Sequence, residues 1–175
     1  MARIADPNRP VQLLDDIIRY LAREGLAGMS LRPLARAVGS SPRVLLYYFG
    51  SRERMIGRVL GELRRRQQLD LARAPSRGLS ADTWIVWRRL SAPDHLPAFR
   101  LFFEALALAF RSPRRYQEFL RASVDDWLAF AGASRVHGTV ILAGLRGFML
   151  DLCATGDRRR VDRAVRAWTK TLEAL

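Results

Sequence analysis

Arg43 and Tyr47 are the pair of residues best suited, by type and spacing, to bind a partner. In a helix over residues 42–49 they are four positions apart and therefore share one face. Leu45 and Phe49, also four apart, share the opposite face. Arginine donates to phosphate oxygens or to the edge of a guanine base, and a tyrosine hydroxyl can contact phosphate. The pattern predicts a short helix with an inward apolar face and an outward face that contacts nucleic acid.

Serines at two predicted helix starts add binding groups around this pair. Ser41 and Ser51 can each cap a helix, whose free backbone N–H groups and positive dipole end suit phosphate. Arg52 begins the second of these helices, and Tyr48 lies on the flank of the first. Arg32, near the start of the preceding helix, is a further candidate, with a solvated surface arginine as the alternative. The predicted DNA-contacting residues are Arg32, Ser41, Arg43, Tyr47, Tyr48 and Arg52.

The charge of the chain favours a polyanionic partner. Its formal net charge is +13 at pH 7, which suits nucleic acid, although an anionic membrane surface or a well-solvated shell would also accommodate it. The arginines are spread along the chain and do not gather opposite one wide apolar face, which argues against a membrane-surface helix. Glu104 and Arg146 interrupt the most apolar stretches before the roughly 18 residues that a membrane span needs. We therefore expect no membrane contact.

The same sequence argues against catalysis and metal binding. With two histidines and one cysteine, Cys153, it has no metal-ligand spacing, and it lacks both a nucleophile–base arrangement and a Gly-rich phosphate loop. Asp125 and Asp126 are neighbours that point in different directions on a helix, so they do not form a cooperating pair. We expect no enzyme activity, no cofactor and no metal. The single cysteine and the absence of an apolar targeting segment lead us to expect a cytoplasmic protein.

Helical periodicity indicates an all-α fold. Apolar residues recur at steps of three and four over residues 14–21 and 161–175, while strand-like alternation is hard to find. Helix starts are predicted where Ser or Asp precedes a proline or a charged run, Asp94 and Ser112 among them, and glycines supply the stops. The pattern gives about nine helices with short connections.

A loose, polar stretch over residues 72–82 predicts a domain boundary. The first domain covers residues 1–60, with its fourth helix running on to about residue 71, and the second covers residues 72–175.

Within the first domain, the lengths of the elements match a helix-turn-helix. A helix over residues 31–38 is followed by a tight turn at Gly39 and by the helix over residues 42–49. In that motif the second helix enters the major groove of DNA, which is about 12 Å wide. An ordinary corner between two helices has the same lengths, and the chemistry of Arg43 and Tyr47 is what favours DNA binding.

Two runs of residues carry a more specific signal: GLAGMSLRPLARAVG at residues 25–39 and YYFGSRE at residues 47–53. They resemble the DNA-binding region of the tetracycline-repressor (TetR) family of bacterial transcription regulators. The family pattern for the second run is Tyr, any residue, His, Phe, any residue, Ser, Lys. This chain has Leu46, Tyr48 and Arg52 where the family has the Tyr, His and Lys. Arg52 keeps the charge and Tyr48 a polar ring, whereas Leu46 lacks the hydroxyl.

The resemblance, which extends over about residues 11–60, implies a homodimer with an N-terminal DNA-binding domain and a C-terminal helical domain that dimerises and binds a small-molecule effector. It implies a ligand-responsive repressor whose two third helices enter major grooves about 34 Å apart on a palindromic operator. The alternative is an all-helical adaptor that binds other proteins without specific DNA binding. An adaptor, however, has no need of the cluster formed by Arg43, Tyr47 and Arg52.

An effector pocket is expected between the middle helices, where aromatic residues gather. Aromatic residues at helical spacing are more often core residues, which is the alternative for each of them. His95 and Arg146 are polar residues of the same region. The candidate effector-binding residues are Trp87, Phe103, Glu104, Trp127 and His137.

The helix predicted over residues 134–155 is apolar nearly all round, so every side of it must be covered. Its glycines and alanines allow a neighbouring helix to approach closely, and the last helix can complete the cover. We expect the last two helices to form a two-fold, four-helix interface, with a core helix of a monomer as the alternative. The candidate interface residues are Ile141, Leu145, Phe148, Leu152, Val161, Val165, Trp168 and Leu172.

Overall fold

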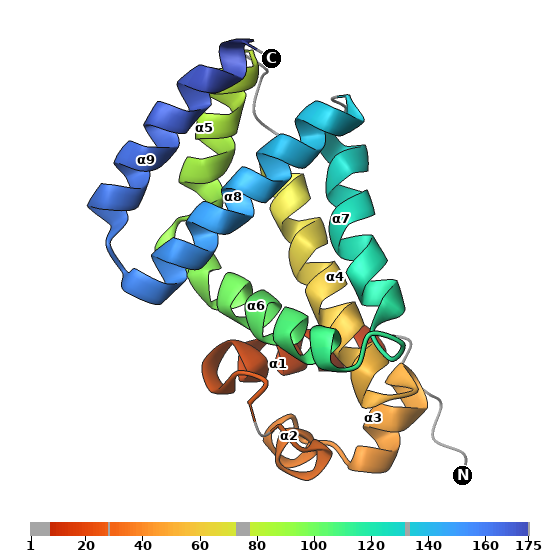
Figure 1. Cartoon of the computed structure of the whole chain (residues 1–175). Coiled ribbons are helices and arrows are strands. Elements are labelled where there is room, and N and C mark those ends of the chain that lie inside the picture. The colour runs from red at the N-terminus through yellow and green to blue at the C-terminus, as the bar shows by residue number, and fades with distance from the viewer. Residues whose placement is uncertain (1–7, 28, 73–77, 132–133, 175) are drawn as a thin grey trace.

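Helices make up the fold, as the periodicity predicted. A computed structural model of the 175-residue chain describes residues 8–27, 29–72, 78–131 and 134–174, which contain nine α-helices, two short 3₁₀ helices and no strand (Figure 1). In chain order the α-helices are α1 (Arg9–Glu24), α2 (Leu31–Ala37), α3 (Pro42–Phe49), α4 (Arg52–Leu71), α5 (Leu79–Leu90), α6 (Leu96–Arg111), α7 (Gln117–Ala131), α8 (Arg135–Thr155) and α9 (Arg158–Thr171). The 3₁₀ helices are η1 (Pro93–His95) and η2 (Leu172–Ala174). The prediction of an all-α fold with about nine helices is confirmed.

The helices divide the molecule into two ends joined by α4. In Figure 1, α1, α2 and α3 gather at the lower end, and α5 and α9 lie side by side at the upper left. α4 starts beside α3 and extends along α7 towards the other end, and α6 and α8 pack against each other between the two ends. The short helices α2 and α3 are therefore carried far from α9.

Serine caps determine where α3 and α4 begin. The Ser41 side chain accepts a hydrogen bond from the backbone N–H of Val44 at 3.3 Å, and Ser51 accepts one from Arg54 at 3.1 Å. Between α2 and α3, Gly39 has a φ of 60°, a left-handed conformation that glycine adopts without steric cost. The predicted tight turn between two short helices is present.

Two predicted helix starts are wrong by a few residues. Asp94 lies inside η1, which leads directly into α6 at Leu96, so Asp94 is a turn residue. After Ser112 the chain makes a turn in which the N–H of Arg115 donates to the Ser112 carbonyl at 3.0 Å, and α7 begins only at Gln117. In both places three-residue turn hydrogen bonds form before the helix itself starts.

Two hydrophobic clusters hold the helices together. The first contains buried residues of α1 to α4 together with Leu101, Ala105 and Ala109 of α6. The second surrounds the fully buried Trp87 of α5 with residues of α8 and α9, and it also contains Leu71 at the end of α4. α4 therefore contributes to both clusters. The division into domains at residues 60 and 72 stays a prediction.

α8 is the one helix in the described part of the chain that is long and apolar enough to cross a membrane, judged by length and composition alone. Its mean hydropathy is 1.3 over the most apolar 18 residues. In the structure it packs against α6, α7 and α9, and much of its surface stays exposed. A helix of this kind is also typical of a subunit interface, where a second chain covers the apolar surface.

Candidate nucleic-acid interface and effector cavity

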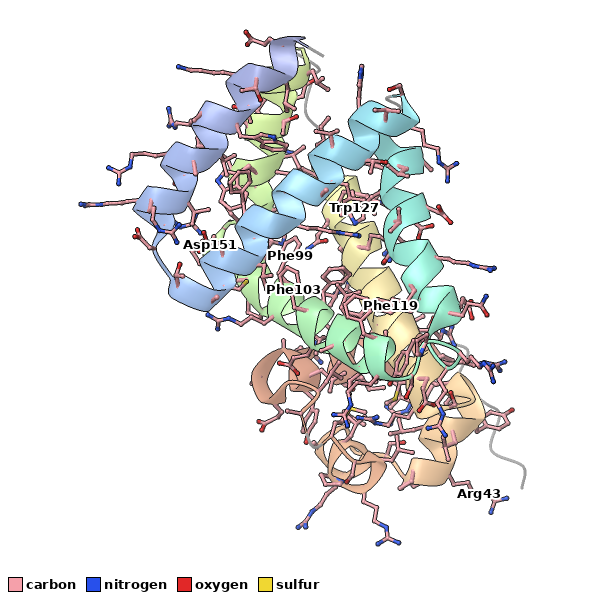
Figure 2. The ribbon with its side chains drawn as sticks, in the orientation of Figure 1. Arg43, Phe99, Phe103, Phe119, Trp127 and Asp151 are labelled. Carbon is pink, nitrogen blue, oxygen red and sulfur yellow. The ribbon has the colours of Figure 1, made fainter. Side chains whose placement is uncertain are left out.

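The two faces of α3 are divided as its sequence predicted. Leu45 and Phe49 are 1% and 4% exposed and belong to the first hydrophobic cluster. On the other side Arg43 is exposed and Tyr47 is 80% exposed. Figure 2 shows Arg43 reaching away from the helices at the end of the molecule. The helix is thus anchored by its apolar face and presents a guanidinium and a phenol to solvent.

The end of α3 is held in place by α4. The guanidinium of Arg58 donates to the backbone carbonyl of Tyr48 at 3.1 Å and lies 5.3 Å from the centre of the Phe49 ring. Tyr48 is partly buried against the first cluster, and its ring meets that of Tyr47 edge-on with centroids 5.1 Å apart. Leu46, at the position where a Tyr was expected from the family pattern, is 40% exposed and offers an apolar surface only.

The two remaining arginines predicted to contact DNA differ in their surroundings. Arg32, on α2, is exposed. Arg52, at the first turn of α4, is partly buried, and its Nε has no hydrogen-bond partner among the described residues. Burial raises the pKa of the nearby Tyr116 hydroxyl, and the positive charge of Arg52 opposes that shift. Arg52 therefore lies close to the protein surface and is not extended freely into solvent.

A central cavity of about 540 Å³ lies between α4, α5, α6, α7 and α8. Its size is within the range of about 300–1,000 Å³ that is typical of small-molecule sites. The walls are mainly apolar and aromatic side chains, and the labelled Phe99 and Trp127 are two of them (Figure 2). The polar residues that line it are Arg64, Gln67, Asp82, Thr83, Ser123 and Arg146.

Two of the five candidate effector-binding residues line this cavity. Trp87 does so as a fully buried side chain whose indole N–H donates to Asp162 of α9 at 2.8 Å, so its polar group is already used. Trp127 lines it next to Phe130, with ring centroids 5.8 Å apart. Both tryptophans therefore provide apolar wall.

The other three candidates, Phe103, Glu104 and His137, are not among the residues that line the cavity. The Glu104 carboxylate accepts a hydrogen bond from the backbone N–H of Leu26, so it holds the turn after α1. Phe103 packs against the second cluster. Sequence spacing could not show which face of α6 meets the cavity, because both faces carry aromatic or aliphatic residues.

Arg146 is the most unusual group in the cavity wall. Its guanidinium lies 5.2 Å from the centre of the Phe102 ring and donates to the backbone carbonyl of Ser123. Burial, together with the nearby positive charge of Arg64, lowers the pKa of Arg146 to about 10. Arg64 was absent from the predicted effector residues, because the sequence assigned α4 to the DNA-binding domain. It begins the polar run RRRQQ at residues 64–68, so the sequence contained no signal that Arg64 faces a cavity.

The predicted dimer-interface residues lie on α8, on α9 and, for Leu172, at the start of η2, and all eight are buried or partly buried within the subunit. Four of them, Leu152, Val161, Val165 and Leu172, are at most 3% exposed within the subunit. Ile141 and Leu145 line the central cavity, and the rings of Phe148 and Trp168 pack on each other with centroids 5.4 Å apart. The four buried residues are core residues of the subunit, and the contribution of the eight predicted residues to a dimer interface stays a prediction. Since α8 is apolar nearly all round, its sequence contained no periodicity that could distinguish an inner face from an outer one.

A different face of α8 is open to solvent. Its residues follow one another at alternating steps of four and three, the spacing that keeps a stripe straight along a helix packed on a partner. Val136, Val140 and Leu150 are 70%, 37% and 52% exposed, and the small residues between them are exposed as well. We call this set the outer stripe of α8; it consists of Val136, Val140, Ala143, Gly147, Leu150 and Ala154.

No protein-family model and no curated protein matches the chain. Solved structures do match over nearly its whole length. EbrR, a multidrug binding protein in complex with imidazole, superposes with a TM-score of 0.74 at 19% identity, covering 95% of this chain and 96% of EbrR. A transcriptional regulator from Rhodococcus sp. RHA1 has a TM-score of 0.73 at 16% identity, covering 93% of this chain and 95% of its own.

A TetR-family transcriptional regulator from Rhodococcus has a TM-score of 0.70 at 14% identity, covering 94% of this chain and 96% of its own. These similarities are at the level of structure, since identities below 20% leave few shared residues. The short helices α2 and α3, the long α4 and the helices behind them therefore form, together, the fold of the TetR-family transcriptional regulators.

Proposed function

We propose that this protein is a DNA-binding transcriptional regulator of the TetR family. The observation that carries the proposal is the outward face of α3. Arg43 and Tyr47, which is 80% exposed, extend into solvent from this short helix, and its other face is buried. A base-reading helix needs side chains that extend beyond the domain, and these two do. α2, which carries the exposed Arg32, and α3, which is capped by Ser41, lie at the same end of the molecule (Figure 1), and this supports contacts of both with the backbone of DNA.

The regulator acts as a homodimer, with the outer stripe of α8 as the main contact surface. The stripe is apolar, extends over most of the helix and is exposed in the isolated chain. Its glycine and alanines allow two copies of α8 to approach closely, and exposed Ala164 and Ala167 of α9 extend the small-residue surface. A two-fold dimer presents two copies of α3 to successive major grooves, which requires a palindromic operator.

The regulator responds to a small molecule bound in the central cavity, and the response is the release of DNA. α4 connects the two sites, since it begins next to α3 and its Arg64, Gln67 and Leu71 line the cavity. In one conformation of the dimer the two α3 helices are spaced to fit DNA, and in the other they are not. A ligand that binds the second conformation more tightly lowers the affinity for DNA by the difference between its two binding free energies. A solved structure of similar fold, EbrR, contains imidazole. Because the protein works on DNA, we expect it in the cytoplasm.

Selection of bound sequences from a random DNA pool tests this proposal. The purified full chain should enrich a palindrome whose half-sites are about one helical turn apart. The same selection with the Arg43→Ala variant should lose the preference at one base pair of each half-site. A wild-type chain that enriches no sequence would contradict DNA reading and would favour the alternative, an all-helical adaptor for other proteins.

A further inference from the structure

The charge in the central cavity indicates which class of small molecule it holds. Apart from its polar residues the cavity is lined by aliphatic and aromatic side chains, including Phe99, Phe102 and Trp127. A site of this composition recognises an apolar body. Its specificity is then determined by the few polar groups that reach it.

Two of those polar groups are arginines, and they are not equivalent. Arg64 forms an ion pair with the half-exposed carboxylate of Asp126, so part of its charge is compensated within the protein. Arg146 has no carboxylate within ion-pair distance among the residues that the structure describes. Its one described acceptor is the backbone carbonyl of Ser123, although a guanidinium has five N–H donors.

Burial makes a cation without a carboxylate partner energetically costly. The guanidinium of Arg146 has lost part of its hydration, and the nearby Arg64 adds a like charge, which together depress its pKa. With a pKa of about 10 it still carries its proton at neutral pH. An anion placed against Arg146 would restore the lost hydration and form charge-assisted hydrogen bonds, so the site is electrostatically complementary to a negative head group.

We propose that the central cavity binds an amphipathic organic acid, with its anionic head group on Arg146, supported by Arg64, and its apolar body against Phe99, Phe102 and Trp127. The proposal rests on the cavity's role as the effector site of the proposed regulator and specifies the chemistry of that effector. Because Arg146 belongs to α8, the head group is oriented towards α8 and the apolar body towards the remainder of the cavity.

Three probes of equal chain length separate charge from apolar burial. Decanoate, 1-decanol and decyltrimethylammonium are titrated into the full-length protein by calorimetry, below their micelle concentrations. Tryptophan fluorescence, to which Trp87 and Trp127 of the cavity wall contribute, is the second signal. Decanoate should bind about tenfold or more tightly than decanol, since hydrogen bonds to charged groups contribute this much. The cationic probe should bind more weakly than decanol. Equal binding of decanoate and decanol would overturn the proposal without any variant.

The Arg146→Met variant keeps the length of the side chain and removes its charge. It should lower the affinity for decanoate by about tenfold or more and change that for decanol by less than about twofold. Arg135→Met is the matched control, because Arg135 is on the same helix with an 83% exposed side chain; it should leave all three affinities unchanged. If the Arg146→Met variant lowers the affinity for decanoate no more than the affinity for decanol, Arg146 does not bind the head group.

Arg146→Lys covers the case in which the methionine variant fails to fold. It retains the positive charge and should keep a preference of decanoate over decanol, reduced because the bidentate guanidinium contact is lost. An unchanged preference in this variant would contradict a direct guanidinium contact. None of these titrations contains DNA, so a protein that selects no operator would still give the decanoate result, and each proposal fails separately.

Discussion

The carboxylate of Glu104 in α6 accepts a hydrogen bond from the backbone N–H of Leu26, in the turn that follows α1. Gly25 makes the approach possible, because a side-chain Cβ at that position would lie 3.0 Å from both carboxylate oxygens. Gly25 also has a φ of 72°, which favours glycine. Five residues earlier on the same helix, Phe99 lines the central cavity. The hydrogen bond therefore links a helix of the cavity wall directly to the helices that carry α3.

Replacing Glu104 by Ala should destabilise the protein by about 1–3 kcal/mol, because it leaves the partly buried N–H of Leu26 without an acceptor. Urea unfolding followed by circular dichroism measures the loss. Glu118→Ala is the control, since Glu118 is an exposed glutamate at the start of α7. If both variants unfold at the same urea concentration, the hydrogen bond does not contribute to stability.

Replacing Arg43 by Ala should weaken binding to the selected operator by ~1–3 kcal/mol if the guanidinium reads a base edge. Fluorescence anisotropy with labelled operator and with unrelated DNA provides the measurement. Arg163→Ala, which removes an exposed arginine of α9 at the opposite end of the molecule from α3 (Figure 1), should leave both affinities close to wild type. An equal loss on operator and on unrelated DNA would make Arg43 a phosphate contact.

Arg52→Ala should weaken binding to all DNA sequences to the same extent and reduce the slope of log affinity against log salt by about one. The slope is measured by anisotropy over a series of salt concentrations. Folding stability should change little, because the Nε of Arg52 has no described hydrogen bond to lose. A slope identical to that of the wild type would exclude Arg52 from the DNA interface.

Leu150→Glu should convert the dimer into a monomer at micromolar concentration, because it buries a charge within the proposed α8 contact. Leu150 is 52% exposed in the isolated subunit, so the subunit itself should stay folded. Sedimentation velocity distinguishes the two states. Leu69→Glu, at a leucine of α4 that is 51% exposed, is the matched control and should remain dimeric. A dimer that survives Leu150→Glu would place the interface on another surface.

The free energy of unfolding should decrease as the pH is lowered from about 4.5 to about 2, because Glu62 becomes protonated in this range. Hydrogen bonds from Arg65 and Arg66, together with their charges, lower the pKa of Glu62 from 4.5 to about 2. Because the folded pKa is below the usual one, the stabilisation is complete above pH 4.5 and disappears as pH falls through 2. Glu62→Gln should therefore lower the melting temperature at pH 7 and approach the wild type near pH 2. A difference that is constant with pH would exclude this ion pair as its cause.

Local signals allowed prediction of the elements at the DNA-binding end. Ser41 and Ser51 cap helices through contacts three residues away, and Leu45 and Phe49 define an inner face within one short helix. Such interactions are encoded in neighbouring residues, so a sequence alone can show them.

The role of a residue could not be predicted from the sequence where its contacts are distant along the chain. The role of Glu104 depends on a residue 78 positions away. The outer stripe of α8 could not be distinguished because apolar residues surround the helix, and the contribution of Arg64 to the cavity required knowing how far α4 extends past the first domain. In each of these three cases tertiary packing decides the role of the residue.

The continuity of α4 also has a thermodynamic consequence. Its 20 residues form a rod about 30 Å long, with Met55 and Val59 in the first hydrophobic cluster and Leu71 in the second. Unfolding of either cluster would remove the packing partners of one part of α4. It would also expose apolar surface where the unfolded cluster meets the remaining one. The two ends of the molecule are therefore coupled as one cooperative unit, and neither half retains its full core when the chain is cut within α4.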